Sequence, residues 1–340
     1  MASTAQVQAA EQIAPVERSQ AAQTWRRFRK HRLGLIGLIT LILLILSVIL
    51  IPAFSPYEYD TIDQESLLPD VTRPELGLSL SFKPALWTGP QTGSFHPLGT
   101  DVVGRDNLTR LFHGGRISLT VGLVTTILVI FIGSVVGALA GFYGGIVDTL
   151  LMRLVDLMLS LPLLPMLLVI SKSLDQSQIM SNLFGRQLGT VATIILVLSI
   201  FGWLGLSRLV RGSILSLRSL DYVEATRALG ASNRRIILRH LMPNSIAPII
   251  VAATLGVGDF IITESFLSFL GLGVQDPVPS WGNLMQGAQE YATFITDINP
   301  TVEIRGWLIL FPGMMILLTV LSINFIGDAL RDAIDPRLKR

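Results

Sequence analysis

Long apolar runs separated by short polar segments set the pattern of the chain. The first run, 33–51, carries no charged residue, and a helix over it, at about 1.5 Å per residue, would be roughly 28 Å long, enough to cross the hydrocarbon core of a membrane. Similar runs follow at about 117–141, 150–170, 190–210, 246–270 and 307–327. The spacing therefore predicts an all-α integral membrane protein with six transmembrane helices.

Prolines and charges interrupt the third run. Pro162 and Pro165 predict a kink near its middle. Arg153 and Asp156 are three residues apart, so we expect them to form an ion pair on one face of this helix.

Basic residues mark the ends of the runs that should face the cytoplasm. They are frequent in 26–32, 208–239 and 331–340, and sparse in 172–189 and 271–306. Because cytoplasmic loops carry the excess of Lys and Arg, we expect both termini and the segment after the fourth run in the cytoplasm. We predict a cytoplasmic tail at 1–32, an uncleaved first span at 33–53 and a long outer loop at 54–116. A transmembrane core at 117–328 and a second cytoplasmic tail at 329–340 follow.

Composition narrows the function. Half of the residues are hydrophobic, 15% are charged where a soluble domain carries about 25%, and the mean hydropathy is +0.59. The absence of cysteine excludes disulfides, iron–sulfur clusters and cysteine-based zinc sites, and the four histidines have no metal-ligand spacing, so no metal site is predicted. No phosphate-binding loop and no hydrolase motif is present, which argues against ATP binding or catalysis by this chain. The arginines lie at the ends of apolar runs, so the net charge of +2 gives no reason to expect a nucleic-acid partner.

The charged stretch DYVEATRALGASNRRIILRHLMP, residues 221–243, lies between the fourth and fifth runs and is patterned as two short helices. Asp221 and Glu224 predict a capping box at the start of the first helix, and Gly230 predicts a left-handed end. Ser232 or Asn233 can cap the second helix, and Pro243 is expected to stop it. From these residues alone, an amphipathic hairpin that binds anionic lipid is as good an interpretation as a docking surface for a protein.

The same stretch resembles the EAA loop of ABC importer permeases. Glu224 and Ala225, with Gly230 and with Pro243 thirteen residues after it, match the pattern E-A-x-x-x-x-G…P, while Thr226 and Met242 depart from it mildly. Four further stretches resemble the peptide/nickel branch of these permeases, and within it the C-type transmembrane subunit of dipeptide and oligopeptide importers: HPLGTDVVGRDNLTRLFHGGRISLTVG (96–122), FYGGIVDTLLMRLVDLMLSLP (142–162), SFLGLGVQDPVPSWGNLM (268–285) and NFIGDALRDAIDPR (324–337). The segments 60–95 and 286–305 look longer or more divergent than in that family.

The resemblance implies a type I ABC importer permease with a coupling loop at 212–244. It implies these partners: a homologous second permease subunit, two ATP-binding subunits that hold ATP and Mg, an extracytoplasmic substrate-binding protein and the inner membrane of a bacterium or archaeon. The chain itself would bind no cofactor. The substrate would be a di- or oligopeptide, while related branches also carry glutathione, nickel complexes and some sugars, so its identity stays open. The residues expected to couple to the ATPase are Tyr222, Glu224, Ala225, Arg227, Ala228, Gly230, Ala231 and Pro243.

Polar residues in and beside the spans are further candidates. Ionisable residues inside a membrane usually face a cavity or a partner, so Asp259, Thr263, Glu264 and Asn324 are candidates for the pathway lining. For Asp259 and Glu264 a hydrogen bond between helices or an interfacial cap is an open alternative. The resemblance makes Asp101, Arg105, Asp106 and Trp281 candidates for an outer gate or a binding-protein contact, although the residues alone predict a hydrogen-bonded loop at 98–106 and an interfacial Trp281.

Two other classes of function compete. An ion-coupled secondary transporter would use Asp259 or Glu264 as its coupling site and need no ATPase, but the sequence lacks the inverted repeat and the paired broken spans of that class. A membrane enzyme would need a catalytic set, and the sequence offers none.

Overall fold

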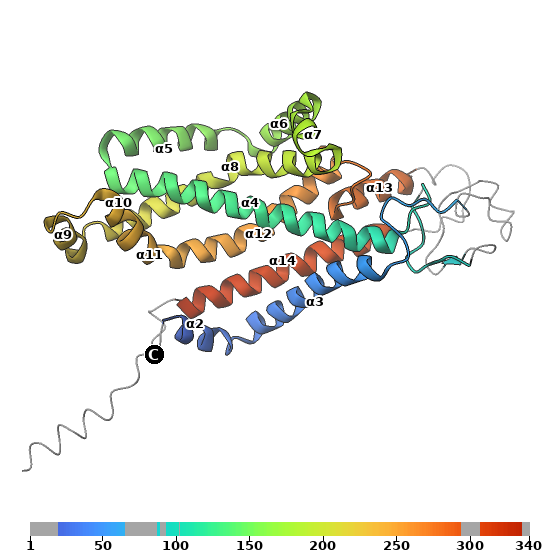
Figure 1. Ribbon diagram of the computed structural model, residues 1–340, viewed down its shortest axis with the longest axis horizontal. Coiled ribbons are helices and arrows are strands. Elements are labelled where there is room, and N and C mark those ends of the chain that lie inside the picture. The colour runs from blue at the N-terminus through green and yellow to red at the C-terminus, as the bar shows by residue number, and fades with distance from the viewer. Residues whose placement is uncertain (1–19, 65–86, 89–92, 102, 294–306, 335–340) are drawn as a thin grey trace, which may run out of the picture.

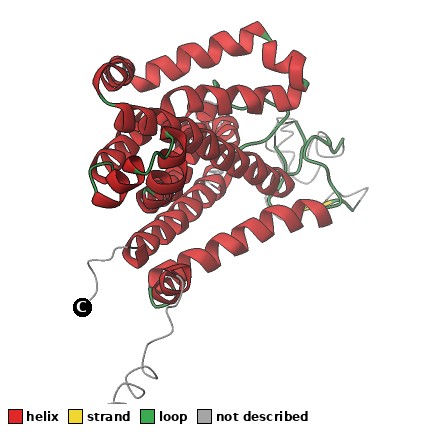
Figure 2. Ribbon diagram, turned by 60° about the vertical axis from the view of Figure 1, so that its left-hand side comes forward, coloured by secondary structure: helices red, strands yellow, loops and turns green. Residues whose placement is uncertain are grey.

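The protein is described by a computed structural model that places residues 20–64, 87–88, 93–101, 103–293 and 307–334. Most of this part of the chain is helical (Figure 1; Figure 2). Among the described residues, two short strands, β1 (Trp87–Thr88) and β2 (Phe95–His96), pair as an antiparallel ribbon at one end of the helices.

Within the described residues, five helices are long and apolar enough to cross a membrane. They are α3 (Arg32–Phe54), α4 (Asn107–Tyr143), α8 (Arg186–Leu217), α12 (Ile246–Phe269) and α14 (Trp307–Ile334). The shorter helices are α2 (Gln20–Phe28), α7 (Ile179–Phe184), α9 (Asp221–Ala228), α10 (Asn233–Ile236), the wide helical turn η3 (Ile237–Leu241), α11 (Met242–Asn244) and α13 (Trp281–Thr293).

The third predicted span is a broken one. It consists of α5 (Gly145–Ser160) and α6 (Leu163–Ser177), which meet at an angle of 90° and make a sixth span if they count as one. The break falls at Leu161, which has extended dihedral angles because the following residue, Pro162, disfavours the helical region for it. The predicted proline kink is therefore present, and it is a right-angled turn.

The ion pair predicted inside this span is wrong. Asp156 pairs with Arg208 of α8 and not with Arg153. Asp148 of α5 likewise accepts two hydrogen bonds from Arg211 of α8, at 2.5 and 2.6 Å. The carboxylates of α5 thus face a neighbouring helix, which the sequence spacing within α5 could not indicate.

Helix α4 lies along α8 through the centre of the molecule (Figure 1). Their backbones approach closely at Gly137, where an added Cβ would lie 2.5 Å from the carbonyl oxygen of Ser207. Helix α4 begins at Asn107, before the predicted start at 117, because Asp106 caps it. Helix α3 packs on α14 in the same glycine-dependent way, and a Cβ at Gly37 would lie 2.7 Å from the Ser322 carbonyl oxygen.

Candidate functional site

The helix pair between α8 and α12 is the first candidate site. We call α9, α10, η3 and α11 together the knob. Figure 1 shows it beyond the end of α4, at the same end of the molecule as α2.

The start of the knob differs from the predicted capping box. Leu220 occupies the cap position, and its carbonyl accepts from the N–H groups of Val223 at 2.9 Å and Glu224 at 3.2 Å. Asp221 already lies inside the first turn, so the prediction that it caps α9 is wrong. Asp221 and Glu224 instead place negative charge at the positive end of the helix dipole.

The end of α9 confirms the prediction for Gly230. Its φ is +81°, its N–H donates to the Arg227 carbonyl at 3.0 Å, and the Ala231 N–H donates to the Thr226 carbonyl at 3.3 Å. This bonding pattern is the Schellman motif, which requires a left-handed residue and so favours glycine.

The second half of the knob is a continuous helical path. Ser232 caps α10 by accepting from the Arg235 N–H at 3.4 Å, as predicted. The predicted stop at Pro243 is wrong, because Pro243 lies within α11. Just before it the Met242 N–H bonds to the Ile237 carbonyl five residues back, and this wider turn gives room for a proline ring that has no N–H to donate.

The knob is fastened to two spans. Val223, Ile236 and Leu241 are completely buried in one cluster with Phe142 of α4 and Ile214 of α8. Sequence reasoning did not single out this contact. The FYGG segment at the end of α4 carries the aromatic ring, but only the fold brings it to the knob.

Arginines add to this attachment. The Arg218 guanidinium donates to the carbonyls of Gly141 at 3.0 Å and Phe142 at 3.3 Å. The Arg227 guanidinium lies 5.8 Å from the centroid of the Phe142 ring, within range of a cation–π interaction. The knob is therefore bound to the ends of α4 and α8, in addition to its covalent link to α12.

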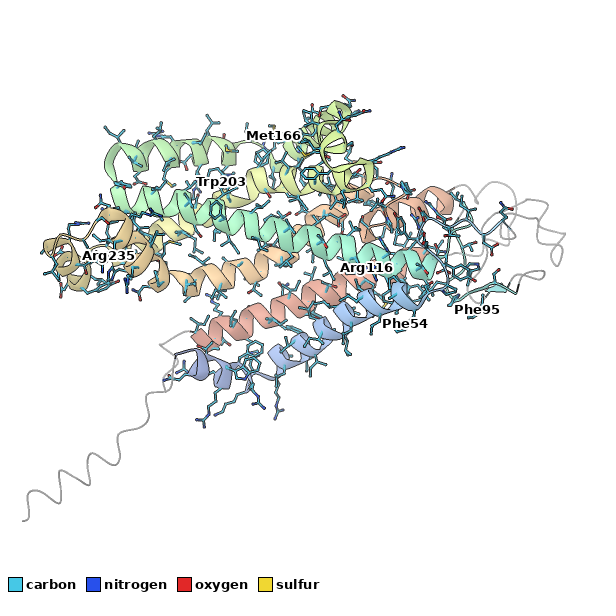
Figure 3. The ribbon with its side chains drawn as sticks, in the orientation of Figure 1. Phe54, Phe95, Arg116, Met166, Trp203 and Arg235 are labelled. Carbon is cyan, nitrogen blue, oxygen red and sulfur yellow. The ribbon has the colours of Figure 1, made fainter. Side chains whose placement is uncertain are left out.

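One face of the knob is exposed, and we call it the knob face. Leu229 is 88% exposed beside Gly230. Tyr222 is partly exposed, and its hydroxyl accepts from Asn244 at 3.3 Å. Figure 3 shows Arg235 at this end of the molecule. The other residues that were predicted to couple to the ATPase also lie on this part of the chain. Ala231 is half-buried, and the exposed ones are Glu224, Ala225, Arg227, Ala228, Gly230 and Pro243.

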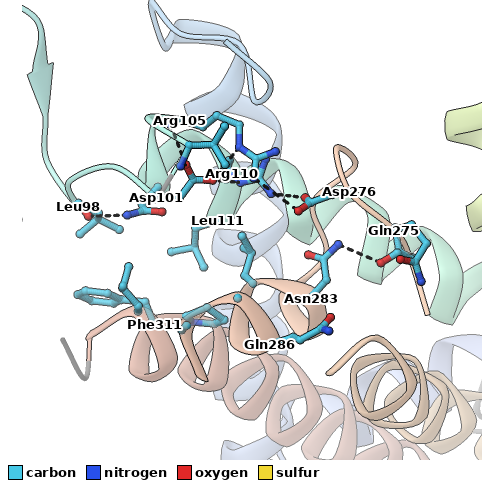
Figure 4. Close-up of a pocket in the computed structure, with 18 residues that line it drawn as sticks. Leu98, Asp101, Arg105, Arg110, Leu111, Gln275, Asp276, Asn283, Gln286 and Phe311 are labelled. Atoms are coloured by element: carbon cyan, nitrogen blue, oxygen red, sulfur yellow. Dashed lines mark hydrogen bonds and ion pairs between the residues drawn. The ribbon is translucent and has the colours of Figure 1, made fainter. Parts of the chain in front are cut away.

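The opposite end of the molecule holds the candidates for the outer gate. Arg105 Nε donates to Asp101 Oδ2 at 2.7 Å, and Arg110 Nη2 donates to Asp276 Oδ1 at 2.8 Å (Figure 4). These charged groups line one side of a pocket of about 270 Å³ between α4, α13 and α14. Arg110 is almost completely buried, and its Nε has no hydrogen-bond partner within the described residues.

Two of the outer candidates are interior residues. Asp106 is buried and caps α4 by accepting from the Thr109 N–H at 2.7 Å. Trp281 is completely buried and donates to the Leu111 carbonyl at 3.0 Å, so the prediction of an interfacial tryptophan is wrong. Both residues position the outer segments and present no surface to a partner.

A buried histidine that the sequence did not mark joins these outer segments. His96 accepts or donates at both ring nitrogens, with Asp106 Oδ1 at 2.9 Å and Asp63 Oδ2 at 3.1 Å. Burial lowers the pKa of His96, but the hydrogen bonds to Asp106 and Asp63 outweigh it and leave the pKa raised. The Tyr57 ring stacks on the imidazole at 4.5 Å between centroids.

The polar residues of α12 point in different directions. Glu264 is completely buried and accepts from Ser118 of α4 at 2.9 Å and from Ser268 at 2.7 Å, which is the helix–helix hydrogen bond left open above. Asp259 is exposed on the surface of this chain. Thr263 donates to the Asp259 carbonyl at 2.7 Å, and Asn324 on α14 is half-buried.

The fold and these sites define a class: a helical membrane protein with a short helical unit that packs against the ends of two spans and exposes its other face. Residues 133–340 match the family model described as "Binding-protein-dependent transport system inner membrane component", and residues 19–69 match the "N-terminal TM domain of oligopeptide transport permease C". The chain belongs to the family of binding-protein-dependent transport system inner membrane components. It is a multi-pass inner-membrane permease subunit of an ABC importer, and this family of membrane subunits is distinct from the ATPase.

Three relatives cover most of the chain. The oligopeptide transport system permease protein OppC of Haemophilus influenzae is 40% identical over 73% of this chain and 72% of its own length. The dipeptide transport system permease protein DppC of Alkalihalophilus pseudofirmus is 40% identical over 72% of this chain and 73% of its own. The glutathione transport system permease protein GsiD of Pectobacterium atrosepticum is 38% identical over 72% of this chain and 74% of its own.

Proposed function

We propose that this chain forms half of the translocation pore of a di- or oligopeptide importer, as its C-type permease subunit. The other half is a homologous permease chain. Two ATP-binding subunits bind ATP and Mg and hydrolyse the ATP, and an extracytoplasmic binding protein delivers the peptide. The names of the OppC and DppC relatives support this substrate class. The excess of basic residues at the end that holds α2 and the knob supports a cytoplasmic position for both termini.

The observation that carries the coupling proposal is the construction of the knob. It presents a face of small and exposed residues, and on its other side it is buried against α4 and α8. We infer that an ATP-binding subunit docks on Tyr222, Glu224, Ala225, Arg227, Ala228, Gly230 and Ala231. Pro243 shapes the connection to α12.

The contacts of the knob indicate which helices would move when an ATP-binding subunit displaces it. A push on the knob moves the ends of α4 and α8 directly, because Phe142 and Ile214 share its buried cluster. Closure of the ATP-binding subunits then biases the pore between an inward-open and an outward-open state. Helix α12 follows through η3 and α11.

We propose Asp259, Thr263 and Asn324 as residues that face the pathway between the two halves. An exposed carboxylate on a span is costly in lipid by about 2.5–3.5 kcal/mol on insertion scales, so water or a partner should cover Asp259. We do not assign Glu264 to the pathway surface. Its side chain holds α12 to α4 through the hydrogen bond from Ser118. At the outer end Asp101 and Arg105 line an open pocket and are the proposed contacts for the binding protein.

An aspartate at the most exposed leucine of the knob tests the coupling proposal. Leu229→Asp places a charge on a side chain that is 88% exposed, so folding should be unaffected. We expect the ATP-binding subunits to be lost when the chain is purified, and ATP-driven peptide uptake to fall to background. The matched control is Leu183→Asp in α7, 68% exposed at the other end of the molecule, which should keep both. Normal uptake and normal subunit recovery with Leu229→Asp would overturn the docking assignment.

A further inference from the structure

A groove with apolar walls opens at the end of the molecule where α2 meets the spans. It has a volume of about 580 Å³ and lies between α2, α3, α12 and α14. Trp25 and Phe28 of α2 form one wall, Ile250 of α12 forms another, and Leu330 and Ile334 of α14 lie between them. Thr24 is the one polar side chain among its lining residues.

The α2 wall is held in place by bonds to the end of α14. Arg27 Nη1 donates to the Ala333 carbonyl at 3.4 Å. His31 caps α3 by accepting from the Gly34 N–H at 3.1 Å, and its Nε2 lies 3.6 Å from Asp332 Oδ2. The rings of Trp25 and Phe28 stack with centroids 5.7 Å apart. The groove is thus a formed feature of the fold.

Exposed positive charge is concentrated in α2, in the turn that follows it and at the start of α3. Arg26, Arg29, Lys30 and Arg32 are exposed, and their side chains make no hydrogen bond or ion pair within the described part of the chain. Figure 3 shows long side chains that extend from α2 and the start of α3 away from the other helices. Such clusters at the cytoplasmic end of a membrane helix attract anionic lipid headgroups.

We propose that the groove and these four basic residues together form a binding site for one anionic phospholipid of the bilayer. An acyl chain fills the apolar groove, and the headgroup phosphate lies against Arg26, Arg29, Lys30 and Arg32. A free anion would leave the apolar walls exposed, and an apolar partner helix would leave four cations without counter-charge. A phospholipid satisfies both, since it carries an anionic group and a hydrocarbon chain in one molecule. This site is independent of the transport proposal, because it concerns α2 and the adjoining ends of α3, α12 and α14.

Trp25 makes the site measurable, because its side chain lines the groove and is 54% exposed. The complete transporter is placed in nanodiscs that contain phosphatidylglycerol or phosphatidylcholine with brominated acyl chains, which quench tryptophan on contact. The difference between the wild type and Trp25→Phe isolates the Trp25 signal from the other tryptophans. We expect brominated phosphatidylglycerol to quench Trp25 at a lower mole fraction than brominated phosphatidylcholine.

Two variants separate the headgroup from the groove. Arg26→Gln/Arg29→Gln/Arg32→Gln should raise the half-quenching fraction of phosphatidylglycerol by about tenfold or more, since it removes three of the four cations that attract the anionic headgroup. The matched control Arg153→Gln/Lys172→Gln/Arg186→Gln removes three charges elsewhere and should leave the preference unchanged. Ala247→Phe fills the groove and should abolish Trp25 quenching by both lipids while the charges remain.

Equal quenching by the two lipids would overturn the proposal, because it would mean contact with bulk lipid only. Absence of Trp25 quenching in the wild type would also overturn it, because a protein would then cover the groove.

Discussion

The Arg218 guanidinium donates a hydrogen bond of 3.0 Å to the carbonyl of Gly141, and so ties the root of the knob to the last turn of α4. The bond satisfies a carbonyl at a helix end and places a cation at the negative end of the helix dipole. It joins two segments that are 77 residues apart in the sequence. This contact is where a force on the knob should enter α4.

Removing this cation should loosen the knob without unfolding the spans. For Arg218→Met we expect faster hydrogen exchange over 221–241, because two carbonyl bonds worth about 1–3 kcal/mol in total are lost. ATP hydrolysis should continue while peptide uptake falls. The control is Arg153→Met, an exposed arginine on α5. Unchanged exchange over 221–241 would show that the apolar cluster alone holds the knob.

A methyl group at Gly230 should interfere with coupling through backbone strain. Gly230→Ala forces a residue with a Cβ into φ of +81°, at about 1–2 kcal/mol, although the surrounding space is open. We expect reduced ATP-driven uptake with normal amounts of protein in the membrane. Gly185→Ala is the matched control, since Gly185 also has a left-handed φ, of +80°, and open space around it, but lies at the opposite end of α8. If both variants reduce uptake equally, the effect belongs to stability and not to the knob.

The buried His96 should make the stability of the outer end of the protein depend on pH. Because its folded pKa is raised above the unfolded value, its contribution to stability is fully present below about pH 6.5 and is lost as the pH rises through the folded pKa. Hydrogen exchange over 93–106, corrected for intrinsic rates, should therefore be slower at pH 5.5 than at pH 8.5. In His96→Gln this dependence should disappear, because the groups that face the ring, Asp63, Asp106 and Tyr57, then have no titrating partner. A dependence that persists in His96→Gln would assign it to another group.

Glu264 should act as a hydrogen-bond acceptor between α12 and α4 and not as an ion-coupling site. Glu264→Gln keeps an acceptor oxygen for the serine hydroxyls, so we expect full ATP-driven uptake and a small loss of thermal stability. Glu264→Leu leaves Ser118 and Ser268 without this partner in a buried site, and should lower stability by about 1–3 kcal/mol for each unsatisfied group. Thermal unfolding in detergent measures both. Loss of uptake with normal stability in Glu264→Gln would favour a role in the pathway.

Short-range signals made part of the candidate site predictable. Gly230 and Ser232 are recognisable because helix caps depend on residues three to five positions away. The same local logic failed at Asp221 and Pro243. At the first, the carbonyl of Leu220 supplies the cap, and at the second, a wide turn admits the proline.

The sequence by itself determined the class of fold, the spans and the presence of a folded charged unit between two of them, because hydropathy and capping are properties of neighbouring residues. Only the tertiary structure decided which charges pair and which face inward. Asp156 pairs with Arg208, Glu264 with Ser118 and His96 with two aspartates across distances of many residues. Such partners are selected by the packing of whole helices, which places side chains from separate segments at hydrogen-bond distance, and no spacing within one segment records that choice.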